Sequence, residues 1–446
     1  MLLTGCTLVQ KDQAVDAATV ILQMGDQTVT KGEVQEEVES QLNYMSYVYS
    51  MYGYSFDATS AEAVADAREE AINTFKTELV SNAKIAELGL DQLTEEEEAQ
   101  VKAQAEETYQ SNLDYILTGN YADSELSDEE KNAAAAADLE NLGYTMESAL
   151  ENARESALQE KLRQEIIKDV TVTEKEITAE YESRTASGKE TYENNTASWT
   201  TAANNGTTLY YTPAGVRFVK QILVKFLDED QTKIDDANSK VTDAQSKVTG
   251  AESKVSDAQA VLDDEEASEE DKTAAQADLE AAQAELEAAQ AELEAAQKEA
   301  EDVTNAAFAN IDAAADEILT ELELGADWDT LMADKTQDPG MQSGVTAERG
   351  YAVSADMTSF DSAFVEAAMA LEKIGDVSGK IRGTTYGYYI IKYVGDAEEG
   401  PVALDEVKET IQSSLLSSKQ STTYSETLQG WVDAADFKEN LGALDQ

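Results

Sequence analysis

A seven-residue repeat of apolar side chains between residues 234 and 296 restricts most strongly how this chain can fold. In a first arm an aliphatic residue recurs at every seventh position, and in a second arm leucine and alanine recur with the same period. The positions are Ile234, Val241, Val248, Val255 and Leu262 with Ala237, Ala244, Ala251 and Ala258, then Leu279, Leu286 and Leu293 with Ala275, Ala282, Ala289 and Ala296. Apolar positions sustained at this period predict a coiled coil.

The short acidic run 263–271 between the two arms favours an antiparallel hairpin. A hairpin within one chain closes at little entropic cost, and alanine in the seam lets two helices approach closely. Each arm of ~28 residues would be about 42 Å long. The alternative is that the arms pair with a second molecule and form a homodimer.

Charge and residue usage narrow the classes of partner and of chemistry. The formal net charge is −59, from 91 acidic and 32 basic residues among 446. Such a polyanion is repelled by phosphate backbones, which argues against nucleic acid as a partner. The chain has no histidine and one cysteine, so it lacks the commonest general base, an intrachain disulfide and a cysteine-based metal site. We therefore expect no metal and no cofactor; a metal site built only from carboxylates is the alternative, and no EF-hand spacing occurs.

The single cysteine, Cys6, lies in a short segment that suggests attachment of lipid. Leu3-Thr4-Gly5-Cys6 resembles a lipobox, in which a signal peptidase cuts before a cysteine that is then diacylated. The resemblance implies lipidation at Cys6, a tether over residues 1–19, and anchoring to the outer face of the cell membrane in a Gram-positive-type bacterium. A chance cysteine near a cytoplasmic terminus is the alternative. No other stretch reaches the ~18 apolar residues that a membrane span needs.

A series of short motifs runs through the second half of the chain. Residues 325–328 are Gly-Ala-Asp-Trp, 337–340 Gln-Asp-Pro-Gly, 349–351 Arg-Gly-Tyr and 386–392 Tyr-Gly-Tyr-Tyr-Ile-Ile-Lys. Upstream, residues 217–224 are Arg-Phe-Val-Lys-Gln-Ile-Leu-Val. In this order and spacing they resemble the parvulin family of peptidyl-prolyl cis-trans isomerases. The resemblance implies a parvulin-like α/β domain over 213–397, interrupted by the coiled coil as an insertion at 229–305.

The same resemblance assigns candidate site residues. Asp338 takes the position of the central acid, and Gln221 and Tyr389 replace the two family histidines. Both replacements can hydrogen-bond, so an altered network is expected. The expected peptide-binding residues are Arg349, Ala352, Met357 and Phe364.

The first part of the chain predicts a strand, a Gly-Asp turn and a helix start over 21–34. Thr30 with Glu33 has the spacing of a capping box. This opening resembles SurA- and PrsA-type foldases and implies a helical chaperone domain over 20–183. Residues 184–212, rich in Ser, Thr, Asn and Gly, are expected to be a linker. A C-terminal helix within 398–446 is expected to pack on the N-terminal domain, and the fold class is α+β.

Four residues of the helical domain form an aromatic and methionine stripe: Tyr44, Tyr47, Met51 and Tyr54. Such a surface can hold unfolded clients through adaptable contacts. We expect the more ordinary outcome, in which the stripe is part of the core.

Together these features predict a membrane-anchored extracytoplasmic folding factor, a chaperone with a peptidyl-prolyl isomerase domain. Its partners would be unfolded or proline-containing secreted polypeptides and, through lipid, the membrane. The alternative is a non-catalytic chaperone or scaffold that retains the parvulin fold. A solute-binding lipoprotein is disfavoured, because no alternating α/β repeat is long enough for two lobes.

Overall fold

The computed structural model describes residues 13–122 and 124–445. The chain divides into two compact units. Unit 1 takes the described residues up to Thr173 and those from Gln412 onwards, and unit 2 is Glu174–Ile411. The chain therefore enters unit 2 once and returns to unit 1. Cys6, the predicted lipidation site, lies outside the described residues.

Unit 1 opens with a small antiparallel sheet. β1 (Val20–Met24) pairs with β2 (Gln27–Thr30) and also with β9 (Lys438–Glu439), in the order β2-β1-β9. α2 (Lys31–Met51) follows β2 directly, and the predicted capping box between Thr30 and Glu33 is confirmed at its start. The expected tether contains a short helix, α1 (Gln13–Ala17).

The rest of unit 1 is helical, and its helices begin where side chains cap them. Capping boxes form at Thr94 and at Ser127. The long helices are α3 (Ala61–Glu87), α4 (Glu95–Asn120), α5 (Asp128–Asn141), α6 (Met146–Ile167) and, from Gln412 on, α14 (Leu404–Ala434). Leu428 of α14 is buried with Ile85 of α3 and Leu162 of α6, so the C-terminal helix contributes to the core of unit 1.

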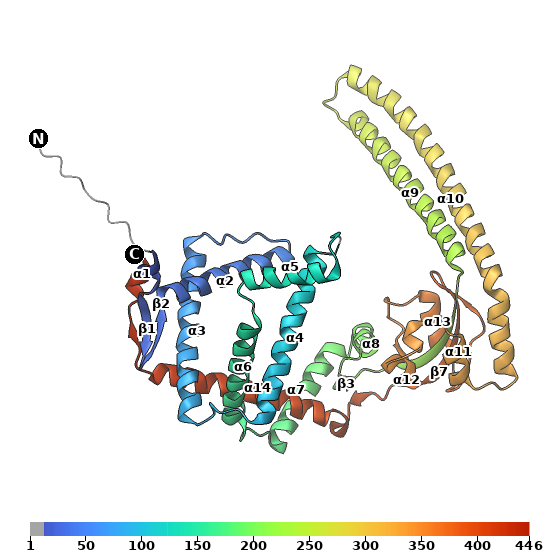
Figure 1. The fold of residues 1–446 in the computed structure, drawn as a ribbon. Coiled ribbons are helices and arrows are strands. Elements are labelled where there is room, and N and C mark those ends of the chain that lie inside the picture. The colour runs from blue at the N-terminus through green and yellow to red at the C-terminus, as the bar shows by residue number, and fades with distance from the viewer. Residues whose placement is uncertain (1–12, 123, 446) are drawn as a thin grey trace, which may run out of the picture. The chain divides into compact units, whose positions relative to one another are not determined.

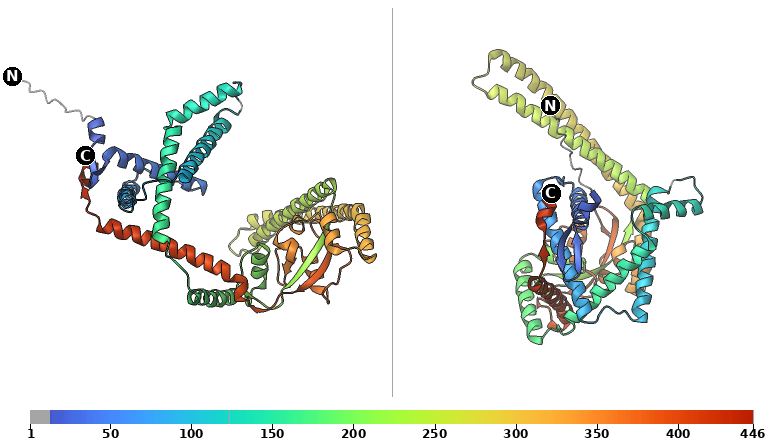
Figure 2. Two further views of the ribbon diagram at one scale, coloured as in Figure 1. Left: turned by 60° about the horizontal axis from the view of Figure 1, so that its bottom comes forward. Right: turned by 60° about the vertical axis from the view of Figure 1, so that its left-hand side comes forward.

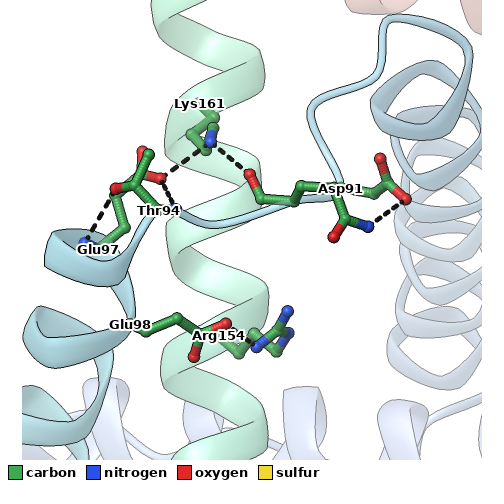
Figure 3. Close-up of polar contacts among 7 residues, drawn as sticks. Asp91, Thr94, Glu97, Glu98, Arg154 and Lys161 are labelled. Atoms are coloured by element: carbon green, nitrogen blue, oxygen red, sulfur yellow. Dashed lines mark hydrogen bonds and ion pairs between the residues drawn. The ribbon is translucent and has the colours of Figure 1, made fainter.

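Ion pairs join α4 to α6 (Figure 3). The Lys161 ammonium lies 3.0 Å from a carboxylate oxygen of Glu97 and donates to the carbonyl of Gln92 at 2.8 Å. Seven residues earlier on α6, Arg154 pairs with Glu98, the residue after Glu97, at 2.5 Å. Since Glu97 also closes the capping box of α4, one carboxylate both starts this helix and attaches it to its neighbour.

Unit 2 is built on a four-stranded antiparallel sheet in the order β5-β4-β7-β6. The central pair, β4 (Arg217–Lys225) and β7 (Gly387–Asp396), is rich in the β-branched and aromatic residues that favour strands. β5 (Tyr351–Val353) and β6 (Ile381–Arg382) flank them. Both of the central strands lie in segments that the parvulin resemblance singled out.

Alternation along these two strands separates the two faces of the sheet. Ile222, Val224 and Ile390 face one way and pack with the last part of α10 (Glu269–Glu323). Val219, Leu223 and Ile391 face the other way and pack with α13 (Ser362–Ala370). Side chains at 221 and 389 belong to this second face by the same alternation.

The remaining elements of unit 2 are α7 (Glu174–Tyr192), α8 (Thr196–Asn204), β3 (Tyr211–Thr212), α11 (Trp328–Lys335), η1 (Pro339–Met341), α12 (Val345–Arg349) and β8 (Gly400–Pro401). In unit 1, the short helix η2 (Leu441–Asp445) is the last element.

The heptad arms form a long antiparallel helix pair. α9 (Asp228–Asp263) and α10 lie side by side and extend far beyond the sheet (Figures 1 and 2). Alanines of both arms are buried in the seam, as the repeat predicts. Three lysines of α9 pair with three glutamates of α10, each pair seven residues from the next: Lys240–Glu299, Lys247–Glu292 and Lys254–Glu285. The arms therefore pair within one chain.

α10 does not end at the base of this helix pair. Its last part continues into the core of unit 2, where Phe308, Ile311 and Ile318 are buried beside Trp328. At the same level Asn310 of α10 donates to Asp230 of α9 at 2.7 Å. One unbroken helix thus belongs to both the insertion and the body of the unit.

Residues 184–212, expected to be a linker, are structured. They contain the end of α7 and all of α8, and Trp199 is buried with Val216 and Ala352. The Trp199 indole donates to the carbonyl of Tyr211 at 2.7 Å. The polar composition of this segment concealed the few apolar residues that fix it against β5.

Among the described residues, no helix combines the length and the apolar character that crossing a bilayer requires.

Candidate functional site

A cavity of about 470 Å³ opens on the face of the unit 2 sheet that carries α13. Its volume lies within the range of small-ligand sites. The lining residues come from β4, β5, β7, α13 and the segments around Asp338, Phe360 and Tyr386: Gln221, Leu223, Lys225, Gln337, Asp338, Pro339, Tyr351, Ser359, Phe360, Asp361, Phe364, Tyr386 and Tyr389. All three predicted catalytic positions and one predicted peptide contact, Phe364, therefore lie around one cavity.

Asp338 is the centre of a buried hydrogen-bond network. Its carboxylate accepts from the Gln221 amide at 2.6 Å and from the Tyr351 hydroxyl at 3.1 Å. It also accepts from the backbone N–H of Gly340 at 2.9 Å, because Asp338 caps the short helix η1. Asp338 is 8% exposed, so these three donors stand in for water. Burial and the neighbouring Asp338 charge raise the pKa of Tyr351, so its proton stays on the phenol.

Gln221 donates to this network and leaves its own oxygen without a partner. Its Nε2 is bonded to Asp338, whereas its Oε1 is buried and accepts no hydrogen bond within the part of the chain that the structure describes. The opposite amide orientation would set Oε1 against a carboxylate oxygen, so the contact with Asp338 fixes the orientation.

Tyr389 does not join the Asp338 network. Its hydroxyl donates to Asp361 at 3.2 Å, and burial with the Asp361 charge raises the pKa of Tyr389. Asp361 also accepts from the backbone N–H of Thr384 at 2.5 Å and caps α13 through the N–H of Ala363. The two positions where the family has histidines are thus connected to two different carboxylates.

Four aromatic rings form a continuous wall of the cavity. Ring centroids of Tyr351 and Phe360 lie 4.9 Å apart, those of Phe360 and Phe364 5.6 Å, and those of Phe364 and Tyr389 5.4 Å. These spacings are those of favourable tilted or edge-to-face pairs. The wall begins at the Asp338 network and ends at the Asp361 network, so the cavity is apolar between two polar groups.

Three of the expected peptide-binding residues do not line this cavity. The guanidinium of Arg349 stacks on Phe218 at 4.8 Å and donates to the carbonyl of Ala203 at 3.1 Å. Ala352 is fully buried beneath α8, because Tyr351 takes the cavity face of β5 and the next residue must face the other way. Met357 is buried in the core under α13.

Sequence reasoning missed Tyr351, Phe360 and Asp361 as cavity residues. A period-two pattern across 350–353 would have assigned Tyr351 and Ala352 to opposite faces, which is the signal for Tyr351. Asp361 has no comparable signal, since its contact with Tyr389 depends on the path of the loop before α13.

The tyrosine and methionine stripe of α2 is exposed, so the expectation that it belongs to the core is wrong. Tyr44 is 65% exposed, Tyr47 62%, Met51 65% and Tyr54 71%. The stripe occupies the last part of α2 and the loop after it, where Asp57 is the only charged residue between positions 40 and 60. No group of side chains suited to a metal ion occurs among the described residues.

No family model matches the chain. Among curated proteins it is similar to the foldase protein PrsA of Clostridium botulinum, with 32% identity over 127 residues, 28% of this chain and 36% of the relative. It is also similar to the foldase protein PrsA of Clostridium acetobutylicum, with 24% identity over 180 residues, 40% of this chain and 49% of the relative. The chain thus spans between about a third and a half of the length of these relatives.

Among solved structures, the foldase protein PrsA from Streptococcus pneumoniae aligns with 96% of this chain and 97% of its own length. The identity is 14% and the TM-score 0.26, so the relationship rests on the sequence matches and not on superposition. On those matches, the chain is similar to PrsA foldase proteins over part of its length.

Proposed function

We propose that this protein is an extracytoplasmic folding factor whose unit 2 is a parvulin-like domain with a peptidyl-prolyl isomerase site. The observation that carries the proposal is the aromatic cavity with the buried Asp338 network at its base. The names of its relatives, foldase proteins, support the same function. The substrates would be unfolded or proline-containing polypeptides.

The cavity has the features that rotation of an X-Pro amide requires. The barrier of ~18–20 kcal/mol arises from amide resonance, and no nucleophile or proton abstraction is needed to lower it. A catalyst has to hold the proline ring and bind the twisted amide more tightly than the planar one. The rings of Tyr351, Phe360 and Phe364 would hold the proline, and the wall would exclude water from the amide carbonyl.

The polar groups would orient that amide. Asp338 holds Gln221 and Tyr351 in fixed positions, and Asp361 does the same for Tyr389. Preorganised dipoles of this kind cost no reorganisation during the reaction. Gln221, Asp338 and Tyr389 are accordingly the proposed catalytic positions, and Phe364 is the proposed ring contact.

A protease-coupled peptide assay tests this function, because uncatalysed isomerisation takes about 10–100 s at 25 °C. The wild type should shorten that time, and Phe364→Ala should lose most of the acceleration. Tyr115→Ala, an exposed aromatic of unit 1, is the matched control and should behave as the wild type. Gln221→His with Tyr389→His restores the family residues and should raise the rate. A wild type with no acceleration contradicts the isomerase proposal.

A second candidate function, a chaperone without catalysis, is favoured by the exposed stripe of α2. An apolar, nearly uncharged surface on a chain of net charge −59 is suited to apolar segments of unfolded polypeptides. Tyr44→Ser with Tyr47→Ser should then weaken suppression of client aggregation while leaving isomerisation unchanged. Equal protection by wild type and variant would remove the stripe as a client surface.

We further propose that lipid at Cys6 anchors the protein to the outer face of the cell membrane. Cys6 is the only cysteine, and its surroundings resemble a lipobox. Expressed with its upstream codons, the protein should partition with membranes, and Cys6→Ala should release it. A wild type found wholly in the cytoplasm would refute the anchor.

A further inference from the structure

The inner wall and the rim of the cavity differ in the polar groups that they present. Exposed residues form the rim: Lys225, Gln337, Pro339, Ser359 and Tyr386. The inner wall consists of the four rings of the aromatic wall together with Leu223, Gln221, Asp338 and Asp361. A ligand that fills the cavity meets the inner wall, so the polar atoms there decide what is selected.

The phenol protons of the inner wall are already engaged. The Tyr351 proton is directed at Asp338 and the Tyr389 proton at Asp361, with oxygen–oxygen distances of 3.1 and 3.2 Å. The Gln221 amide donates one hydrogen bond to Asp338 at 2.6 Å. Each phenol oxygen retains lone pairs, so the tyrosines can accept a hydrogen bond but have no proton to offer.

The inner wall also contains an acceptor that nothing satisfies. Gln221 is 7% exposed, and its Oε1 finds no donor within the described residues. A buried carbonyl oxygen without a donor is unfavourable, and a bound group with an N–H would remove this deficit. A carboxylate or a purely apolar side chain placed beside this atom would leave it unsatisfied.

The charges around the cavity also favour a ligand group that donates hydrogen bonds and is positively charged. Two carboxylates, Asp338 and Asp361, line the cavity, and Lys225 is the only cation among the described lining residues. Lys225 is exposed at the rim, where solvent screens it, whereas the carboxylates are buried or half-buried. The field inside the cavity is therefore negative.

From these observations we propose that the cavity selects a polypeptide with lysine or arginine directly beside the proline. The proline ring packs on Phe360 and Phe364, and the neighbouring cation donates to Gln221 Oε1 and to the phenol oxygens. This inference rests on the proposed function, since it names the substrate class of the same cavity. It concerns which sequence binds and does not depend on the rate of isomerisation.

Binding of short fluorescent peptides to the full chain tests the inference. The central set varies the residue before proline as Lys, Ala or Glu, and a second set places the same residues after proline. The decisive control moves the lysine three positions away from proline, because the net charge of −59 attracts any basic peptide. Salt dependence of the two lysine peptides should then be similar, and their affinities should differ.

We expect the adjacent lysine to bind roughly tenfold more tightly than alanine, the scale of one charge-assisted hydrogen bond, and glutamate to bind most weakly. Gln221→Met, of similar size but without the acceptor, should remove most of the preference while circular dichroism shows a folded protein. Equal affinities for adjacent and distant lysine would overturn the inference without any variant. Peptide binding with this preference but no isomerisation would instead contradict only the catalytic part of the proposed function.

Discussion

The α9–α10 insertion and the body of unit 2 are stabilised in opposite ways, although α10 belongs to both. In the insertion, alanine and leucine recur every seven residues and each layer resembles the next. In the body, the contacts are single: Phe308 lies against Phe226 and Tyr388, and Asp338 against Gln221 and Tyr351. We therefore expect substitutions in α10 to cost little stability where the helix belongs to the insertion and much more where it belongs to the body.

The largest expected effect tests this contrast within α10. Phe308→Ala removes a ring that is 4.7 Å from the centroid of Phe226 and 4.8 Å from that of Tyr388. Truncation of a buried phenylalanine costs about 3–5 kcal/mol of unfolding free energy. Leu279→Ala, in the seam of the insertion, should cost about 2 kcal/mol, because a two-helix seam lets water and neighbouring side chains fill the space. Urea denaturation followed by tryptophan fluorescence, with Trp328 in the body, measures both.

The second prediction concerns the polar half of the body. Asp338→Ala deprives Gln221, Tyr351 and the N–H of Gly340 of their acceptor, and should lower the free energy of unfolding by about 3 kcal/mol. Asp278→Ala, an exposed carboxylate of the insertion, is the matched control and should leave the urea midpoint unchanged. Equal midpoints for the two variants would show that the Asp338 network adds nothing to stability.

These two cases also show what the sequence could and could not predict. The helix pair of the insertion follows from its period together with the acidic run 263–271, because the repeat indicates which residues of the two arms face each other. A hydrogen-bond network around Asp338 that includes Gln221 and Tyr389 is what the parvulin resemblance implies, and in the structure Gln221 contacts Asp338. The contact between Tyr389 and Asp361 was not expected, since it depends on where a loop returns.

The position of α8 could not be predicted from the sequence for a similar physical reason. Residues 184–212 have few apolar side chains, so composition predicts a linker. Trp199 and Asn204 nevertheless fix the segment, Trp199 by burial and Asn204 by hydrogen bonds to both backbone groups of Ala352 at 2.8 and 2.9 Å. Two specific contacts outweigh the local preference of many polar residues. They also explain why Ala352 is covered by α8 and does not reach a peptide.

The third prediction concerns how the stability of the body depends on pH through Tyr351. Burial raises the pKa of Tyr351 above its ordinary 10.0, so the native state keeps a proton that the unfolded chain loses. The stability from this group is present below pH 10.0 and is lost as pH rises towards the folded pKa. The free energy of unfolding should therefore fall less steeply above pH 10 in Tyr351→Phe than in the wild type. Parallel curves would contradict a role for Tyr351.

The fourth prediction removes the insertion from the comparison. Residues 241–298 are excised and the ends joined by a short Gly/Ser loop, which keeps Ile234 and Val303, both packed in the body core. The body should retain its cooperative unfolding and nearly its wild-type midpoint, because the excised residues contact mainly each other. Loss of cooperativity would show that the long helix α10 stabilises the body from beyond its base.

The smallest expected effect concerns the ion pairs along the insertion. Lys240, Lys247 and Lys254 each pair with a glutamate of α10 in the same heptad position, and all six side chains are about half exposed. Exposed pairs gain little because water and salt screen them and long side chains lose freedom when they pair. Replacing the three lysines by glutamine should leave thermal unfolding unchanged at 0.15 M salt and lower it slightly at low salt, where α9 and α10 would repel more strongly. A large loss at both salt concentrations would mean that the charges, and not the alanine seam, determine how the two helices pair.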